Sequence, residues 1–181
     1  MSKRILIISA SYRRDGNSDH LADEFAKGAK EAGNEVEKIY LADKKIEFCR
    51  GCVVCQNTKR CVIHDDMRDI LEEMRNFEVL VFATPIYYYE MSGQMKTFLD
   101  RTNPLYTDEY DFKDIYLLAA SADEDAKSID GAKKGLEGWI YCFEKTSLKG
   151  VVHAGGVDKK GDILKYRKIL QYAYDVGQTI D

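Results

Sequence analysis

The sequence predicts a three-layer α/β protein built on a five-stranded parallel sheet. Five short apolar runs alternate with longer segments in which apolar residues recur at helical spacing. Strands that alternate with helices pair in parallel through right-handed crossovers, so helices are expected on both faces of the sheet. With five strands and no barrel-length repeat, we expect the strand order 2-1-3-4-5. The 181 residues are expected to form a single domain, 1–181.

Each predicted strand is a short apolar run. RILIIS (4–9) and VLVFAT (79–84) are almost wholly apolar, which is typical of strands covered on both faces. EVEKIYL (35–41) contains several charged residues and is expected to be more exposed. The predicted strands are 4–9, 35–41, 79–84, 114–121 and 148–155.

The segments between these strands carry apolar residues on one helical face. In the segment 18–33, Leu21, Phe25 and Ala29 recur every fourth residue, and Gly33 is a typical residue just beyond a helix C-terminus. The predicted helices are 18–33, 65–77, 92–102, 126–146 and 161–180.

Composition and charge exclude several classes of function. The net charge of −4 argues against a nucleic-acid partner, because phosphate contacts need clustered Lys and Arg. The apolar run in MSKRILIISASYRRDG is too short for a signal peptide, and no later run reaches transmembrane length. We therefore expect a cytoplasmic protein without membrane association.

The loop after the first strand, SASYRRDGNSDHL, carries hydroxyl and amide side chains and opens directly into a helix. Free backbone amides and the positive dipole end of a helix suit a phosphate. Asn17 or Ser18 could equally be a simple helix cap. The loop has no G-x-G-x-x-G and no Walker lysine motif, so a dinucleotide-binding fold or a nucleoside triphosphatase is disfavoured.

The loop after the third strand lies within ATPIYYYEMSGQMKTFLDR (83–101). Its three consecutive tyrosines, Tyr87 to Tyr89, and Met91 offer flat, polarizable surface to a planar ring system. The backbone amides from Thr84 onward could bond the polar edge of that ring. The alternative is that the tyrosines cover the core.

Four of the five cysteines lie in CRGCVVCQNTKRC (49–61), which we call the cysteine segment; its spacing is C-x2-C-x2-C-x5-C. In a reducing compartment, clustered cysteines indicate metal or redox chemistry before structural disulfides. Structural zinc usually takes two C-x2-C pairs far apart, so zinc is less expected. Cys52 and Cys55 could instead pack against the core, and the lone Cys142 is expected to do so.

These three segments occur in the order and spacing of flavodoxin-like NADPH-dependent FMN reductases. The chain most resembles the cysteine-bearing branch, the iron–sulfur flavoproteins, over nearly its whole length and most strongly at 4–121. The resemblance implies a flavodoxin-like sandwich in which the first loop binds the FMN phosphate and the loop after the third strand contacts the isoalloxazine. The residues implied to bind FMN are Ser9, Ser11, Arg13, Asn17, Ser18, Thr84, Pro85, Ile86, Tyr87, Tyr88, Met91, Ser92, Gly93 and Ser121.

The chain departs from the family pattern in the first loop, where Ala10 replaces a usual glycine and Tyr12 a usual proline. In the iron–sulfur branch, four thiolates hold a 4Fe–4S cluster, so the resemblance implies one on the four clustered thiols. Other relatives keep cysteines here as plain flavin reductases. Because the segment follows the second strand, we expect its thiols at the carboxyl edge of the sheet, beside the flavin. The four implied ligands are Cys49, Cys52, Cys55 and Cys61.

The resemblance implies an FMN-dependent oxidoreductase. NADPH or NADH would reduce the flavin, which would pass electrons to a small-molecule or protein acceptor, with no essential side-chain acid or base because the flavin carries the chemistry. The relatives imply a homodimer or homotetramer. A flavodoxin-like electron carrier without NAD(P)H turnover and a redox-sensing metal module are the alternatives.

Several other polar residues have simpler predicted roles. Asp65 and Asp66 precede a helix and are expected to cap it. Asp100 and Arg101 are expected to pair with each other or to end a helix. His153 is expected to be a hydrogen-bonded core residue.

Overall fold

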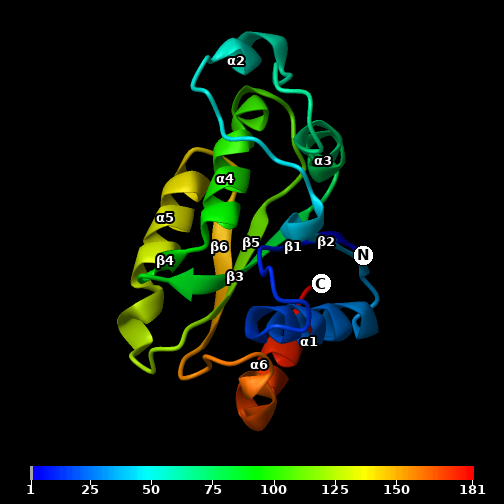
Figure 1. Ribbon diagram of the computed structural model, residues 1–181. Helices are drawn as coiled ribbons and strands as arrows, with labels where there is room; N and C mark the ends of the chain where they lie inside the picture. The colour runs from blue at the N-terminus through cyan, green and yellow to red at the C-terminus, as the bar shows by residue number, and fades with distance from the viewer. Residues whose placement is uncertain (1) are drawn as a thin grey trace.

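A parallel sheet forms the middle layer of the computed structural model, which describes residues 2–181 (Figure 1). The strands run in the order β2-β1-β3-β5-β6, and each neighbouring pair is parallel. Counted among the parallel strands, this is the predicted order 2-1-3-4-5, which is confirmed. The strands are β1 (Arg4–Ser9), β2 (Glu35–Tyr40), β3 (Val79–Tyr87), β5 (Asp114–Ala120) and β6 (Ser147–Ala154).

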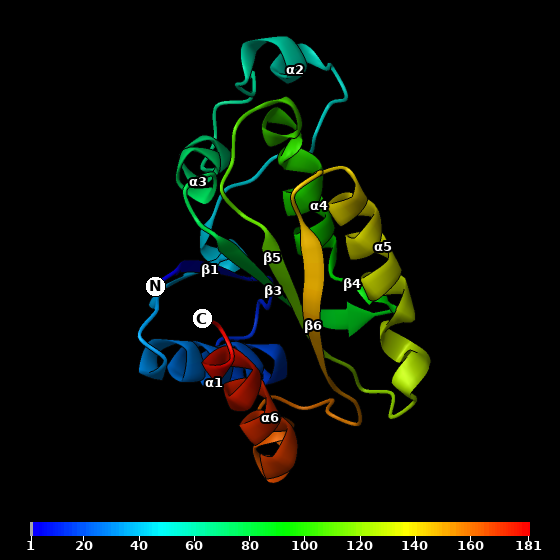
Figure 2. The same ribbon diagram turned by 180° about the vertical axis from the view of Figure 1, so that it is seen from behind.

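Helices cover both faces of the sheet (Figures 1 and 2). On one face lie α1 and α6, and on the other lie α3, α4 and α5. The helices are α1 (Asn17–Glu31), α2 (Val54–Thr58), α3 (Met67–Met74), α4 (Gly93–Arg101), α5 (Asp130–Tyr141) and α6 (Arg167–Gln178). Short 3-10 turns are η1 (Leu41–Asp43), η2 (Asn103–Thr107), η3 (Ala126–Ile129) and η4 (Asp162–Lys165).

The apolar strands feed two separate cores because successive side chains of a strand point to opposite faces. In β1, Ile5 and Ile7 pack on the α1–α6 side, whereas Leu6 and Ile8 pack on the α3–α5 side. All four side chains are at most 2% exposed. A continuous apolar run is therefore required, since both faces are dry.

A short hairpin extends the third parallel strand beyond its predicted end. β3 continues to Tyr87 and pairs antiparallel with β4 (Glu90–Met91). The two turn residues, Tyr88 and Tyr89, have φ angles of 50° and 64°. Two-residue hairpin turns with positive φ normally use Asn-Gly or Gly, so the sequence carries no ordinary turn signal here.

The helix predicted at 126–146 is shorter than expected. Its first residues form η3, and α5 ends at Tyr141. The hydroxyl of Thr146 donates to the carbonyl oxygens of Ile140 (3.0 Å) and Phe143 (2.9 Å). These bonds occupy carbonyls that a continuing helix would use, so the chain turns into β6.

No helix among the described residues is long and apolar enough to cross a lipid bilayer.

Helices α1 and α6 approach each other closely at two glycines. A Cβ added to Gly28 would lie under 3.0 Å from the Tyr174 carbonyl oxygen, and one added to Gly177 would lie under 3.0 Å from that of Phe25. The atoms in the way belong to the backbone, which cannot move aside as the end of a flexible side chain can. The packing of α6 on α1 therefore requires a residue without a Cβ, which is glycine, at both positions.

Substituting Gly177→Ala is expected to lower the free energy of unfolding by about 1–3 kcal/mol, because the added methyl overpacks this contact. Gly138→Ala is the matched control, since an added Cβ at Gly138 in α5 meets no atom of residues 2–181 within 4 Å. That variant should be neutral or gain up to about 1 kcal/mol from helix propensity. Equal urea midpoints for the two variants would contradict the close-packing argument.

Candidate functional site

A small cavity opens at the carboxyl edge of the sheet, where the loops after β1, β3, β5 and β6 meet. Its volume is about 130 Å³. This is the edge at which open parallel sheets bind ligands. The lining residues are Ser11, Arg13, Gly16, Asn17, Ser18, Pro85, Ile86, Tyr87, Ala120, Ala122, Val157, Asp158 and Lys160.

The loop after β1 wraps tightly around the start of α1. The Ser11 hydroxyl donates to the Arg13 carbonyl oxygen at 2.9 Å. A Cβ on Gly16 would lie 2.7 Å from the same carbonyl oxygen and 2.8 Å from Ser11 Oγ. Gly16 precedes α1 and supplies no side-chain cap. The N-terminus of α1 is therefore not occupied by a side chain from its N-cap residue.

Ser18 is the clearest sign that this cavity receives a ligand. The residue is 2% exposed, and its hydroxyl oxygen has no hydrogen-bond partner among residues 2–181. A buried hydroxyl without a partner costs free energy, and native structures rarely keep one. Because Ser18 lines the cavity in the first turn of α1, a bound anion would satisfy its hydroxyl.

The Asn17 side chain bonds to the loop after β6 instead of capping α1. Its amide nitrogen donates to the carbonyl oxygens of Val157 (3.2 Å) and Lys159 (3.0 Å). Its Oδ1 accepts from the Ile163 amide at 3.2 Å. Asn17 therefore ties the loop after β1 to the loop after β6, and Arg13 adds a bond to the Asp158 carbonyl oxygen at 3.0 Å.

Ser9 lies behind the cavity wall and is bonded to a buried carboxylate. The Ser9 hydroxyl donates to Asp19 Oδ1 at 2.9 Å, and Lys38 Nζ lies 2.9 Å from the same oxygen. Burial by itself lowers the pKa of Lys38, but hydrogen bonds to Asp23 and Asp19 outweigh it and leave that pKa raised. Sequence reasoning missed Asp19, because an acidic residue in a first helical turn ordinarily faces solvent.

The hairpin after β3 supplies one wall of the cavity through Pro85, Ile86 and Tyr87. Behind it, Thr84 Oγ1 accepts from the Ser92 amide at 3.0 Å, and Ser92 Oγ caps α4 by accepting from the Met95 amide at 3.3 Å. Both hydroxyl side chains are fully buried. Thr84 and Ser92 therefore fix the hairpin to α4 from within.

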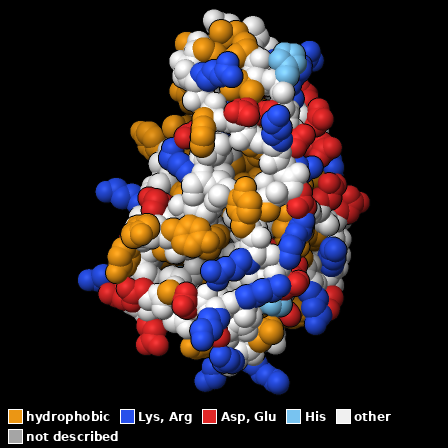
Figure 3. All heavy atoms as spheres, in the orientation of Figure 1, with side chains coloured by type: hydrophobic (Ala, Val, Ile, Leu, Met, Phe, Trp, Pro, Cys, Tyr) orange, Lys and Arg blue, Asp and Glu red, His pale blue; other side chains and the backbone are white. Residues whose placement is uncertain are grey.

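The tyrosines of this hairpin project from the molecule. Tyr87, Tyr88 and Tyr89 are 53%, 101% and 59% exposed. The alternative in which they cover the core is therefore wrong. Hydrophobic side chains also remain exposed in patches on the α4–α5 side and at the α2 end of the face in Figure 3.

The other residues that were predicted to bind the flavin lie near this cavity but contact other parts of the chain. Met91 is buried in the core, and Gly93 lines a separate hollow with Tyr12 and Phe48. Ser121 directly follows β5, but its hydroxyl donates to the Asp123 carbonyl oxygen at 2.7 Å.

His153 is a hydrogen-bonded histidine, as predicted. Its Nε2 lies 2.8 Å from Ser121 Oγ and 3.2 Å from Ser128 Oγ. Burial lowers the pKa of its imidazole below the ordinary 6.5. The neutral ring therefore fits this pair of hydroxyls, directly behind the loop that follows β5.

The cysteine segment does not lie beside the cavity, so that prediction is wrong. Residues 41–48 carry the chain along α4, and α2 then packs on η2 beyond the other end of that helix (Figures 1 and 2). The Thr107 hydroxyl donates to the Gln56 carbonyl oxygen at 2.9 Å, and Lys59 Nζ donates to the Thr107 carbonyl oxygen. The segment and the hairpin therefore occupy opposite ends of α4.

The five cysteines are free thiols in the described part of the chain. Cys55 packs into the core at 7% exposure, Cys49 and Cys52 are exposed, and Cys61 is half-buried. Burial raises the pKa of the Cys55 thiol, and its neighbours Cys61, Cys49 and Cys52 raise it further. Residues 2–181 hold no three His, Cys, Asp or Glu side chains arranged around one metal ion.

Cys142 is exposed, so its predicted core packing is wrong. It is the residue directly after α5, beyond the last buried position of that helix, Ile140. Its sulfur contacts the Gly138 carbonyl oxygen at 3.5 Å. The sequence placed it inside a helix predicted to end at residue 146, five residues beyond the observed end of α5.

A fully buried ion pair lies beneath the cysteine segment. Arg101 and Asp65 have side chains 0% and 1% exposed, with Arg101 Nη1 2.6 Å from Asp65 Oδ2. Burial alone raises the pKa of Asp65, but the hydrogen bonds from Arg101 and from the Glu47 amide hold it below its usual value. Arg101 therefore pairs across 36 residues, and the expected partner, Asp100, bonds Lys96 instead.

The helix-capping prediction for Asp65 is confirmed, since Asp65 Oδ1 also accepts from the Met67 amide at 3.2 Å. Asp66 precedes α3 but makes no side-chain cap; its carboxylate accepts from the Lys45 amide at 2.7 Å.

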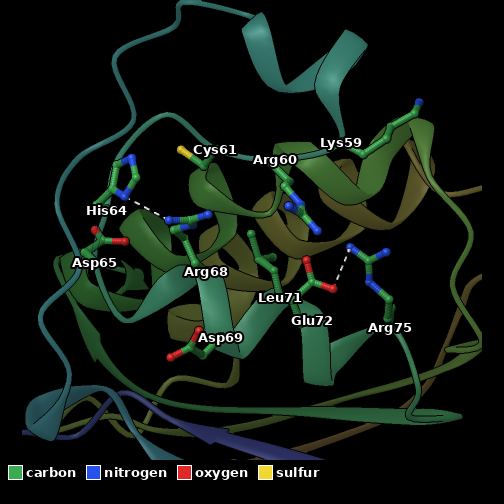
Figure 4. Close-up of a pocket in the computed structure, with 10 residues that line it drawn as sticks. All are labelled: Lys59, Arg60, Cys61, His64, Asp65, Arg68, Asp69, Leu71, Glu72 and Arg75. Carbon is green, nitrogen blue, oxygen red and sulfur yellow. Dashed lines mark hydrogen bonds and ion pairs between the residues drawn. The ribbon is translucent and has the colours of Figure 1, made fainter.

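A second, larger cavity of about 560 Å³ lies between the cysteine segment and α3 (Figure 4). Figure 4 shows Cys61 and His64 at one side of it and Arg60, Arg68 and Arg75 around it. Arg68 Nη1 lies 2.8 Å from His64 Nδ1, whereas Arg75 pairs with Asp108 at 2.8 Å. The sequence did not predict this cavity, because its lining residues, all within 59–75, are mostly charged and resemble solvated surface.

Comparison with known families gives a match over most of the chain. A model of the family described as NADPH-dependent FMN reductase matches residues 3–139. The chain is 31% identical over 183 residues to a putative NAD(P)H-dependent FMN-containing oxidoreductase of Bacillus subtilis, covering 94% of each protein.

The chain is also similar to iron–sulfur flavoproteins. One from Archaeoglobus fulgidus is 37% identical over 97 residues, which cover 54% of this chain and 44% of that protein. The chain thus spans about half the length of such relatives; for one from Methanocaldococcus jannaschii the share is 53%. Among solved structures, an azoreductase from Bacillus anthracis superposes with a TM-score of 0.75 at 19% identity, covering 99% and 100% of the two chains. That likeness establishes the fold.

His153 is expected to make stability depend on pH. Its pKa is lower in the folded chain than its ordinary 6.5, so below pH 6.5 the unfolded chain binds the proton first. Stability should therefore fall as pH drops below 6.5, with a slope approaching about 1.4 kcal/mol per pH unit. Urea unfolding of His153→Gln should show a flatter profile in this window, and a slope equal to that of the wild type would contradict the assignment.

Proposed function

Because the chain belongs to the NADPH-dependent FMN reductase family, we propose that it is an FMN-dependent oxidoreductase using NADPH or NADH. The chemistry that FMN supplies when bound is acceptance of a hydride from the nicotinamide and delivery of electrons to an acceptor. The observation that carries the proposal is the buried hydroxyl of Ser18, which has no partner among residues 2–181 and belongs to a residue that lines the carboxyl-edge cavity. We propose that residues 1–181 form one FMN-binding domain and that it works in the cytoplasm.

The residues at the cavity fit the two ends of FMN. Ser11, Gly16 and Ser18 would hold the phosphate at the start of α1, where the dipole favours an anion. The cavity of about 130 Å³ is smaller than the roughly 300–1,000 Å³ of common ligand pockets, so it suits the phosphate end. Pro85, Ile86 and Tyr87 would contact the ring system, which would lie along the exposed hairpin.

The chain's own residues would bind and orient FMN rather than exchange protons with it. Asn17 and Arg13 hold the loops after β1 and β6 together, and Thr84 and Ser92 hold the hairpin on α4. A fixed hairpin gives the ring a defined face for the nicotinamide. The predicted lack of a catalytic acid or base is part of this proposal.

We further propose that Cys49, Cys52, Cys55 and Cys61 hold a 4Fe–4S cluster. Four thiols in one short segment are the donor set that such clusters use, and the relatives named iron–sulfur flavoproteins support the assignment. A cluster would supply one-electron transfer to a small-molecule or protein acceptor. If the thiols hold no cluster, the protein would work as a plain flavin reductase.

A homodimer or homotetramer would complete the arrangement. The hairpin and the cysteine segment lie at opposite ends of α4, so a second copy of the chain is the simplest way to bring a flavin close to a cluster. The exposed Tyr87, Tyr88 and Tyr89 offer aromatic surface of the kind enriched in interfaces.

Rapid mixing of the FMN-loaded protein with NADPH or NADH under anaerobic conditions is expected to bleach the oxidised flavin. The rate should fall in the range of about 1–1,000 s⁻¹ that is typical of enzyme turnover. If neither nicotinamide bleaches the flavin, the electron-carrier alternative replaces the reductase. A reconstituted protein that binds no FMN would contradict both.

Ser18→Ala is expected to weaken FMN binding by about 10- to 100-fold, the effect of losing one hydrogen bond to a charged group. The FMN-free variant should be as stable as the wild type or more stable, because it loses an unpartnered buried hydroxyl. Fluorescence titration and urea unfolding measure the two effects, and the exposed Ser147→Ala is the control. Unchanged FMN affinity in Ser18→Ala would contradict the phosphate assignment.

A further inference from the structure

We propose that Arg101 is a positioning residue that closes the cysteine segment and presents the Cys61 sulfur for metal binding. The part concerning metal rests on the proposed 4Fe–4S cluster. The closure itself stands on contacts within residues 2–181 and can be measured without iron.

One guanidinium binds both flanks of the cysteine segment. Arg101 Nη1 donates to the Glu47 carbonyl oxygen and to Asp65 Oδ2, both at 2.6 Å. Arg101 Nη2 donates to Asp65 Oδ1 at 2.8 Å. Glu47 comes two residues before the segment and Asp65 four residues after it. A single buried side chain therefore joins two positions that lie 18 residues apart in the sequence, and the Glu47 amide reinforces the link by donating to Asp65 Oδ2 at 2.8 Å.

The same guanidinium reaches one of the thiols. Arg101 Nη2 lies 3.6 Å from Cys61 Sγ, within hydrogen-bonding distance for sulfur. Its two terminal nitrogens thus direct their four N–H groups to the Glu47 carbonyl, the Asp65 carboxylate and the Cys61 sulfur, and only Nε has no partner in the described chain. The Asp65 carboxylate accepts two of the five N–H groups, and the two flanking contacts to Glu47 and Cys61 take two more.

The segment has few other attachments to the body of the protein. Cys55 is its buried side chain, and α2 is bonded to η2 through Thr107. A lysine in place of Arg101 would keep the positive charge beside Asp65. Its single ammonium group cannot replace the planar, forked guanidinium that reaches three partners. Loss of the fork should therefore loosen the segment while the sheet stays intact.

A hydrogen bond to a ligating sulfur has two expected effects. It holds the ligand in the orientation that binds metal, and outer contacts of this kind are worth about 10- to 100-fold in metal affinity. It also stabilises negative charge on the sulfur, so its removal shifts the potential of a bound cluster to a more negative value.

Three variants separate closure from general stability. Arg101→Met combined with Asp65→Asn removes the fork without leaving an unpaired buried charge. Arg101→Lys keeps the charge and the fold. Arg75→Met is the matched control, because Arg75 pairs with Asp108 and makes no bond to residues 47–61 in the described structure.

Limited proteolysis of the FMN-loaded, iron-free proteins tests closure. Cleavage within residues 49–61 should be about tenfold faster in the double variant than in the wild type or Arg75→Met, with flavin binding unchanged. Equal cleavage rates would overturn the proposal. Flavin binding is measured on the same samples, so a failure of the FMN assignment is seen separately.

Anaerobic reconstitution tests the part that concerns metal. The double variant should bind iron about 10- to 100-fold more weakly. Arg101→Lys should retain a cluster whose midpoint potential, followed by electron paramagnetic resonance, is more negative than that of the wild type. A wild-type potential in Arg101→Lys, or a wild-type protein that takes up no iron, would overturn the role of Arg101 toward a metal-bound sulfur.

Discussion

The position of β1 between β2 and β3 is the constraint on which the candidate site depends. β1 pairs with both neighbours in parallel, so the chain must leave β1 at the same edge at which it leaves β3. The loop before α1 and the β3–β4 hairpin are therefore delivered to one place. β5 and β6 extend the sheet on the β3 side and add the loops that complete the cavity. The apolar runs that make this order possible have no part in binding, yet they fix where every binding residue lies.

Helix α4 connects the two chemically distinctive regions. Its first turn is capped by Ser92, whose amide is bonded to Thr84 under the hairpin, and its last residue is Arg101 beneath the cysteine segment. Nine helical residues span about 13–14 Å, so α4 sets a fixed separation between the regions. The charge at its far end is buried with a partner, and breaking such a pair typically costs about 3–5 kcal/mol. Order in the cysteine segment is thus linked to a helix that also holds the hairpin.

The features of the fold that depend on a local sequence pattern were predicted correctly. Apolar runs and helical spacing identified the five parallel strands, their order and the loops that meet at the cavity. The pairing of Arg101 with Asp65 could not be predicted, because a contact between residues 36 apart leaves no periodic trace. The location of the cysteine segment was mispredicted for a related reason. The prediction assumed that the loop after a strand stays at the end of that strand. Residues 41–48 instead run the length of α4. The bonds of Asn17 could not be predicted, because its partners are backbone atoms of a loop about 140 residues later, which no side-chain pattern encodes.

The turn at Tyr88 and Tyr89 has a consequence for the surface that the hairpin presents. Two aromatic residues hold positive φ angles in solvent, where each costs about 1–2 kcal/mol relative to glycine. The Tyr88 ring is fully exposed and adds no buried surface to the fold, whereas the Tyr89 hydroxyl donates to Asp123 Oδ2 at 2.9 Å. Glycine would relieve the backbone cost at both positions, but it would leave the tip of the hairpin without its aromatic surface. A different side chain at Tyr88 would therefore change the surface that the hairpin presents without disturbing the sheet that supports it.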